Sequence, residues 1–156
     1  MEFSETESDP VLAKDRYVGN VILSVPSTDH IPLLTAAFVN IRDGAPQLLN
    51  RVRLTVDNEG DNTNSVIEKL SVFGRYIAYG SGSTLQSDKY VEGIKVAHSR
   101  FVPVTYVWTI DEPNLIEKYM DVGVSAIVSD HPLNVTSIAN KRRLLLAKPG
   151  DLFTCF

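Results

Sequence analysis

The stretch FVPVTYVWTID, residues 101–111, decides the fold class. Its apolar run indicates a buried strand, yet the run ends on an indole, Trp108, and a carboxylate, Asp111. In parallel α/β folds the working groups lie at the carboxyl ends of the strands. We therefore interpret 101–111 as a strand whose tip faces a cleft. Asp111 also stands directly ahead of a helical pattern, where a helix N-cap is the alternative interpretation.

Strand-like and helical patterns alternate along the rest of the chain, with no low-complexity linker between them. Strand-like runs cover 20–25, 51–56, 75–80, 103–110 and 125–130, and helical patterns cover 31–41, 66–73, 90–97, 115–120 and 133–140. Alternation at this spacing predicts parallel βαβ units with right-handed crossovers.

Two α/β architectures fit this alternation. The first is an incomplete (β/α)8 TIM barrel of about five βα units, since a full barrel needs about 250 residues and the chain has 156. The second is a free-standing doubly wound sheet of flavodoxin type. In the barrel interpretation, residues 1–16 are a polar lead-in that we expect to be disordered, and residues 17–156 form the C-terminal part of the barrel.

Composition excludes several classes of protein. A hydrophobic content of 44% and a charged content of 22% are those of an ordinary globular domain. The net charge of −4 argues against nucleic acid as a partner. The single cysteine, Cys155, excludes an intrachain disulfide, and the acidic start MEFSETESDP has no signal-peptide pattern. Asn134 stands in a glycosylation acceptor pattern.

Common catalytic motifs are missing from the sequence. The histidines His30, His98 and His131 have no metal-binding spacing, and no Gly-x-Ser-x-Gly elbow is present. The stretch GSGST, residues 80–84, lacks the lysine of a phosphate loop. His131, which follows Asp130 at a strand end, is the histidine with the best position for a function.

Four segments carry a resemblance to a known family. They are VILSVPSTDHIPLL (21–34), YVWTID (106–111), DVGVSAIVSDHP (121–132) and RLLLAKPGDLFTCF (143–156). Together they resemble the C-terminal part of the arachnid sphingomyelinase D / phospholipase D (dermonecrotic toxin) family, within the glycerophosphodiester phosphodiesterase-like barrel superfamily. The likeness runs from about Tyr17 to Phe156.

The resemblance implies a specific activity. The family cleaves the choline side of sphingomyelin or lysophosphatidylcholine, or transfers the phosphatidyl group to form cyclic phosphates, with two histidines and one Mg²⁺ held by Glu and Asp. Those residues belong to the first strands of the family's barrel, and this chain has no counterpart of them. We therefore expect no catalytic residue and no metal ligand in this chain, and no activity of the chain alone.

The resemblance also implies a substrate-binding wall. Tyr106 and Trp108 match aromatic residues beside the family's choline headgroup, where stacking of a quaternary ammonium is physically sound. Asp111 matches an acid that orients the site, and Asp130 stands where the family has Asn. Ser81 is a second departure, near a position where the family has Asp.

Three further functional interpretations stay open at this stage: a glycerophosphodiester phosphodiesterase relative, a non-catalytic module that binds choline headgroups or lipids, and an α/β domain that shares only ancestry with the family. The expected partner is a choline phospholipid, with peripheral membrane contact and self-association through exposed sheet edges as further expectations. The resemblance implies secretion.

Overall fold

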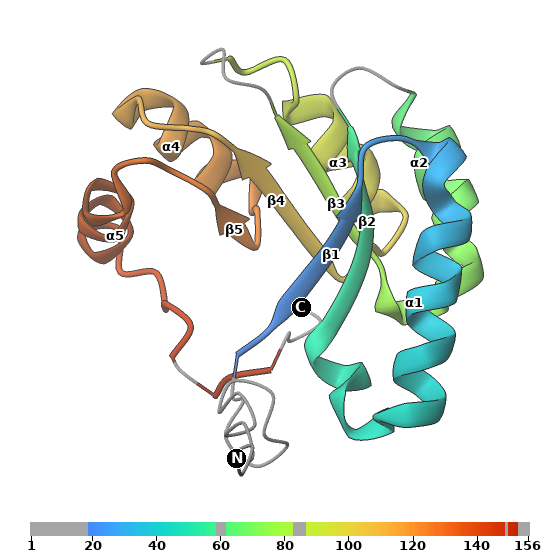
Figure 1. Cartoon of the computed structure of the whole chain (residues 1–156). Coiled ribbons are helices and arrows are strands. Elements are labelled where there is room, and N and C mark those ends of the chain that lie inside the picture. Colours follow the sequence, from blue (N-terminus) through green and yellow to red (C-terminus); the bar gives the residue numbers. More distant parts are fainter. Residues whose placement is uncertain (1–18, 59–61, 83–86, 149, 153–156) are drawn as a thin grey trace, which may run out of the picture.

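The computed structural model describes residues 19–58, 62–82, 87–148 and 150–152. The expected lead-in over residues 1–16 and Cys155 lie outside the described residues. Five parallel strands alternate with helices, as the sequence predicts (Figure 1). The strands are β1 (Val21–Val25), β2 (Val52–Asn58), β3 (Ala78–Gly82), β4 (Val104–Trp108) and β5 (Ala126–Ile127); the α-helices are α1 (Ile31–Gly44), α2 (Thr63–Leu70), α3 (Val91–Ser99), α4 (Pro113–Val122) and α5 (Pro132–Lys141); and three 3-10 helices are η1 (Thr28–His30), η2 (Pro46–Arg51) and η3 (Ser71–Tyr76).

The order of the strands decides between the two architectures. The sheet runs β1-β2-β3-β4-β5, and every neighbouring pair is parallel. A flavodoxin-type sheet reverses its strand order at a switch point, whereas a barrel adds each strand beside the last one. In this order each crossover adds the next strand on the same side of the previous one. Right-handed crossovers of this kind place the helices on one face of a curved sheet, as Figure 1 shows. The flavodoxin alternative is therefore wrong, and the fold is part of a (β/α)8 barrel.

The two faces of the sheet pack differently. Side chains alternate along each strand, so Leu54 and Val107 face the helices while Tyr106 and Trp108 face the other side. The main core lies between the sheet and the helices, and the inner face carries only a small cluster of Ala78, Val104 and Tyr106, with Ile22 and Trp108 against it.

Two strands differ from their expected bounds. The strand expected over 75–80 begins only at Ala78, because residues 71–76 form η3 around Gly74, whose φ is +58°. The run 125–130 forms regular pairing only at Ala126–Ile127, which pair with Tyr106 and Val107 of β4. Its flanks still bond to β4: the amide of Ser125 donates to the Thr105 carbonyl (2.8 Å) and that of Val128 to the Val107 carbonyl (2.8 Å).

The helix ends follow the sequence signals. Asn62 caps α2, because its Oδ1 accepts from the amides of Asn64 (3.0 Å) and Ser65 (3.3 Å). Gly123 ends α4 in the left-handed region (φ +87°), where glycine has no steric penalty. None of the helices among the described residues is both long enough and apolar enough to cross a membrane.

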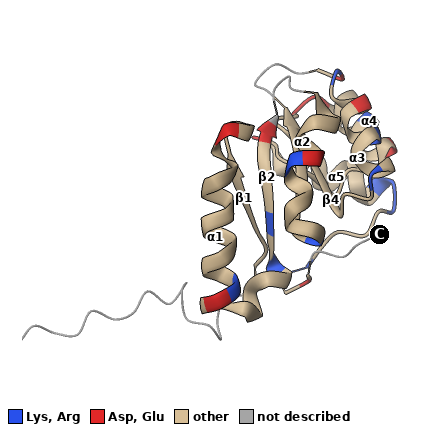
Figure 2. Ribbon diagram, turned by 90° about the vertical axis from the view of Figure 1, so that its right-hand side faces the viewer, with Lys and Arg blue, Asp and Glu red and all other residues tan. Residues whose placement is uncertain are grey.

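The segment after α5 returns to the start of β1 (Figure 1). Asn20 Nδ2 donates to the carbonyl of Asp151 (2.8 Å), and an Nη of Arg51 donates to that of Gly150 (3.4 Å). These bonds tie the far end of the chain to the amino ends of the first two strands. The opposite end, at the strand tips, carries acidic residues (Figure 2).

Candidate functional site

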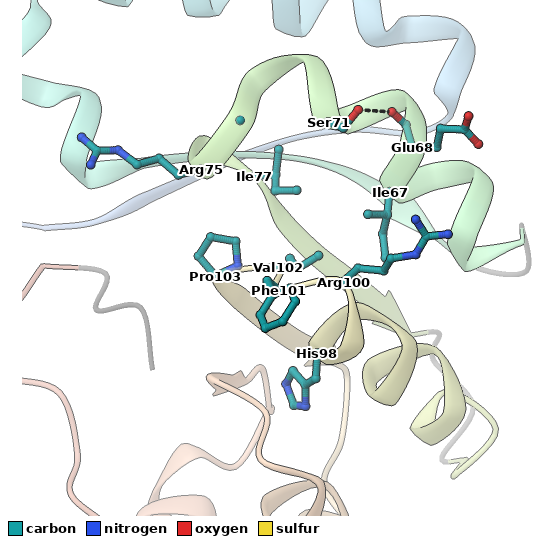
Figure 3. Close-up of a pocket in the computed structure, with 11 residues that line it drawn as sticks. Ile67, Glu68, Ser71, Arg75, Ile77, His98, Arg100, Phe101, Val102 and Pro103 are labelled. Carbon is teal, nitrogen blue, oxygen red and sulfur yellow. Dashed lines mark hydrogen bonds between the residues drawn. The ribbon is translucent and has the colours of Figure 1, made fainter.

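Two of the cavities that the described residues line lie at opposite ends of the sheet. One of about 730 Å³ lies at the amino end of the strands, between η3 and the turn after α3 (Figure 3). Its cationic groups are engaged elsewhere: Arg100 donates to Asn64 Oδ1 (3.0 Å) and Arg75 to Asn50 Oδ1 (3.4 Å), and His98 and Arg100 extend in opposite directions (Figure 3). In a parallel α/β fold this is the stability end rather than the catalytic end.

The second cavity, of about 480 Å³, is the candidate site and is called the inner pocket below. It lies on the inner face toward the carboxyl ends of the strands, where α/β folds place their working groups. The period-two alternation of the strands brings its residues together from β1, β2, β4, β5 and the segments that follow β4 and β5. They are Ile22, Ser24, Asp57, Tyr106, Trp108, Thr109, Ala126 and Val128.

A carboxylate and a phenol interact at the base of the inner pocket. Ser24 Oγ donates to Asp57 Oδ2 (3.2 Å), which holds this carboxylate on the inner face. Burial raises the pKa of Tyr106 to about 12, and the negative charge of Asp57 contributes to the same shift. The phenol is therefore protonated at neutral pH and serves as a hydrogen-bond donor or as an aromatic surface.

Two glycines on β3 make room for the Tyr106 ring and for the Trp108 backbone on β4. Gly80 is paired with Tyr106, and a Cβ at Gly80 would lie 2.1 Å from the Tyr106 ring. Gly82 is paired with Trp108, and a Cβ there would lie 1.5 Å from the Trp108 carbonyl oxygen. The Tyr106 ring thus depends on the absence of a side chain at Gly80, and the close approach of the Trp108 backbone depends on the absence of one at Gly82.

Trp108 is the only tryptophan of the chain and is half-buried in the inner pocket. Its indole Nε1 is buried and has no hydrogen-bond partner among the described residues. A buried donor without a partner is unfavourable by about 1–3 kcal/mol. The ring therefore brings an apolar surface to the pocket, while its N–H is buried and has no partner among the described residues.

Asp111 connects two loops at the rim. Its Oδ1 accepts from the Ser129 hydroxyl (2.7 Å) and from the amide of Asp130 (2.9 Å). The Ser129 hydroxyl, followed by the Asp130 amide, lowers the pKa of the Asp111 carboxyl, against an opposing effect of burial. The N-cap position of α4 is occupied by Glu112, so the capping interpretation of Asp111 is wrong.

The four site residues expected from the sequence thus divide into two pairs. Tyr106 and Trp108 line the inner pocket, whereas Asp111 and Asp130 lie at its rim, where the side chain of Asp130 is exposed. Asp57 lines the pocket and was not predicted. The sequence places Asp57 just after a strand-like run, at a strand end. Only the register of β2 in the sheet shows that this carboxylate lies beside Tyr106 and Trp108.

The histidines and acids do not gather into a metal centre. His98 lies on the helix side of the sheet, where its Nε2 is 3.1 Å from Thr105 Oγ1. Within the part of the chain that the structure describes, no group of three or more His, Cys, Asp and Glu side chains is placed to hold a metal ion. The described residues therefore do not fit the Mg²⁺ site that the family resemblance implies, and no chemical step through a metal follows from them.

Comparison with known proteins supports the resemblance seen in the sequence. No protein-family model matches the chain. It is similar to dermonecrotic toxin LgSicTox-alphaIA1 of Loxosceles gaucho, at 23% identity over 130 residues, which are 78% of this chain and 46% of the toxin. The corresponding toxin LarSicTox-alphaIB2bii of Loxosceles arizonica is 23% identical over 133 residues, which are 78% of this chain and 48% of that toxin. The chain thus spans about half the length of these relatives.

The chain is also similar to the solved structure of a protein described as a glycerophosphoryl diester phosphodiesterase of Silicibacter pomeroyi. Its sequence identity is 14% and its TM-score 0.46, over 82% of this chain and 52% of that chain. The resemblance to the dermonecrotic toxins is confirmed by the sequence comparison, and the partial barrel follows directly from the strand order.

Proposed function

We propose that the inner pocket binds the quaternary ammonium headgroup of a choline phospholipid, such as sphingomyelin or lysophosphatidylcholine. In this proposal the chain supplies the headgroup-binding wall of a phospholipase D-type phosphodiesterase similar to the dermonecrotic toxins. One observation carries it: the rings of Tyr106 and Trp108 and the carboxylate of Asp57 line the same cavity.

A choline headgroup matches the chemistry of these side chains. A quaternary ammonium has no N–H to donate, so it is bound by aromatic faces within about 6 Å and by negative charge. Asp57 provides the charge, and Ser24 keeps its carboxylate in place (3.2 Å). Apolar contacts for the methyl groups come from Ile22, Ala126 and Val128.

The same pocket is poorly equipped for cleavage. Hydrolysis of a phosphodiester needs a positioned general acid and base. Among the described pocket residues, Asp57 is the one carboxylate and no histidine is present; the Ser24 hydroxyl already donates to Asp57, and the Tyr106 phenol is protonated at neutral pH. We therefore assign binding and orientation of the substrate to this chain, and acid–base and Mg²⁺ chemistry to groups outside it.

Fluorescence of Trp108 tests the proposal directly, because no other tryptophan contributes to the signal. We expect a saturable spectral change when the chain is titrated with phosphocholine or with sphingomyelin vesicles, and a weaker one with phosphoethanolamine, which lacks the methyl groups. Asp57→Asn should weaken phosphocholine binding about tenfold, equal to about 1.4 kcal/mol.

The matched control is Asp43→Asn, which removes the same charge from an exposed carboxylate paired with Arg42 at the end of α1. This variant should bind phosphocholine like the wild type. An unchanged Trp108 spectrum, or equal effects of the two substitutions, would rule out the inner pocket as a headgroup site. Turnover of sphingomyelin by the 156-residue chain with Mg²⁺ would contradict the assignment of cleavage to other groups.

A second candidate function is a non-catalytic choline-lipid-binding module. The rings of Tyr106 and Trp108 and the carboxylate of Asp57 favour it as well, because headgroup binding without cleavage requires no catalytic acid, base or metal ion. A relative of the glycerophosphodiester phosphodiesterases would instead recognise glycerol phosphate. Titration with glycerol 3-phosphate tests that alternative. Glycerol 3-phosphate carries no cationic group for Asp57 to attract, so its binding would favour the glycerophosphodiester phosphodiesterase alternative over a choline site.

A further inference from the structure

A second cavity lies on the same face of the sheet as the inner pocket, nearer the amino ends of the strands. It has a volume of about 400 Å³ and is called the leucine pocket below. The sheet forms one side of it, and the segment after α5 lines the other. Its larger apolar side chains, together with one alanine of β5, are Ile22, Val104, Ala126, Leu145, Leu146 and Leu152.

The leucine pocket adjoins the inner pocket. Side chains two residues apart on a strand lie on one face, about 6.6 Å from each other along the strand. On β1 and its start, Asn20 lines the leucine pocket, Ser24 lines the inner pocket, and Ile22 between them lines both. Ala126 on β5 also lines both. The inner face thus carries an aromatic cavity with a carboxylate at the strand tips and an apolar cavity directly behind it.

Polar groups around the leucine pocket are bonded within the protein. Asn20 Nδ2 donates to the Asp151 carbonyl (2.8 Å), and the Asp151 carboxylate accepts from the amide of Lys148 (2.7 Å). Ser125 Oγ accepts from the amide of Thr105 (3.1 Å). A ligand in this pocket would therefore meet mainly hydrocarbon.

The leucines of the segment after α5 are not covered by other side chains of the described structure. Leu145 is 100% exposed, Leu146 43% and Leu152 46%, although all three line the same cavity. Exposed apolar residues are usually scattered singly, and a group of them beside a cavity is typical of a ligand-binding groove. These leucines therefore provide apolar surface that a bound hydrocarbon would remove from water.

We propose that the leucine pocket binds the acyl chain of the same lipid whose headgroup occupies the inner pocket. This inference rests on the proposed function. The two cavities share Ile22 and Ala126, and the headgroup and chain of a phospholipid are covalently joined, so one lipid accounts for both. A second copy of the chain on the leucines would not explain this continuity. Ala126 and Val128 are exposed, so a phosphodiester between the two ends keeps contact with water.

The dependence of affinity on chain length tests the proposal. The 156-residue chain is titrated calorimetrically with phosphocholine and with butanoyl, hexanoyl and octanoyl lysophosphatidylcholine, each below its critical micelle concentration. Each methylene that becomes buried should tighten binding about fourfold, so the octanoyl lipid should bind on the order of a hundredfold more tightly than the butanoyl lipid. Equal affinities along the series, or a homodimer that persists with the octanoyl lipid, would overturn the proposal.

Two leucine substitutions locate the chain on the molecule. Leu145→Asp places a charge on the wall of the leucine pocket and removes no buried contact, so it should weaken octanoyl binding at least tenfold without unfolding the chain. Leu133→Asp is the matched control, because Leu133 is 83% exposed on α5 and lines neither cavity. It should keep the gain in affinity with chain length. Equal losses in the two variants would overturn the assignment to the leucine pocket.

Octanoyl lysophosphatidylglycerol separates this inference from the proposed function, because it has the same acyl chain and no cationic group. If it binds as tightly as the choline lipid, and Leu145→Asp weakens it equally, the choline headgroup site is refuted and the acyl-chain site stands. Binding of phosphocholine with no gain along the acyl series would refute the acyl-chain site and leave the headgroup site in place.

Discussion

At the scale of single residues, the candidate site uses its carboxylates in different ways. Asp57 lies in the inner pocket beside the Tyr106 phenol and accepts from the Ser24 hydroxyl, whereas Asp111 accepts hydrogen bonds from the Ser129 hydroxyl and the Asp130 amide of the neighbouring loop. Asp130 contributes its backbone amide and leaves its side chain exposed. The Asp111 carboxylate accepts hydrogen bonds from the protein itself and so stabilises the loop at the strand end. The Asp57 carboxylate faces the cavity and can interact with a ligand.

The role of Asp111 predicts a pH-dependent effect on stability. Because its folded-state pKa is lowered, the ionised carboxylate stabilises the fold above its unfolded pKa of about 3.9, and this contribution is lost as pH falls through the lower folded value. We expect Asp111→Asn to lower the Tm at pH 7, and the difference from wild type to shrink below about pH 4. Thermal unfolding followed by circular dichroism measures both.

Asp130→Asn is the control for this prediction, since it changes an exposed carboxylate one strand end away and keeps the backbone amide that Asp111 accepts from. It should have little effect on the Tm at either pH. A Tm difference for Asp111→Asn that stays constant from pH 7 to pH 3 would show that the charge of Asp111 does not contribute.

Residue identities in the site could be predicted only in part. Tyr106 and Trp108 are two residues apart on one strand, so the strand period alone places them on one face. Asp57 joins them through the pairing of β2 with β3 and of β3 with β4, which is a long-range property. Asp111 has two local interpretations, and only the position of Ser129 on a later loop decides between them.

At the scale of elements, local patterns predicted which segments are helices and strands better than where they begin. Gly123 ends α4 in the left-handed conformation, which favours glycine. The start of β3 differs because residues 71–76 form a 3-10 turn around Gly74, and β5 is shorter than its run because only two of its residues pair with β4.

The cap of α2 gives a prediction at this scale. Asn62 accepts hydrogen bonds from two amides of the first turn, and it is exposed, so its substitution removes the cap without opening a cavity. Asn62→Ala should lower the free energy of unfolding by about 1 kcal/mol. Chemical denaturation measures the change.

Asn62→Asp is the matched variant, because aspartate keeps the accepting oxygen and adds a negative charge at a helix N-terminus, where it is favourable. Its stability should equal or exceed that of the wild type. If the alanine and aspartate variants lose the same stability, the side-chain cap does not contribute to the fold.

At the scale of the whole molecule, the constant direction of the strand order places every helix on one side and leaves the inner face open. Barrels and doubly wound sheets both alternate strands with helices, so the local sequence pattern alone does not decide between these two architectures. The inner face then brings Tyr106, Trp108 and Asp57 together toward the strand tips.

The position of a choline headgroup on the molecule tests the central claim most directly. Intermolecular nuclear Overhauser effects are measured between the methyl protons of phosphocholine and the aromatic protons of the 156-residue chain. We predict contacts to the rings of Trp108 and Tyr106 and none to Phe101, the exposed ring at the amino end of the strands. Contacts to Phe101 instead, or no contact to Trp108 at saturating phosphocholine, would contradict the assignment of the inner face as the headgroup-binding wall.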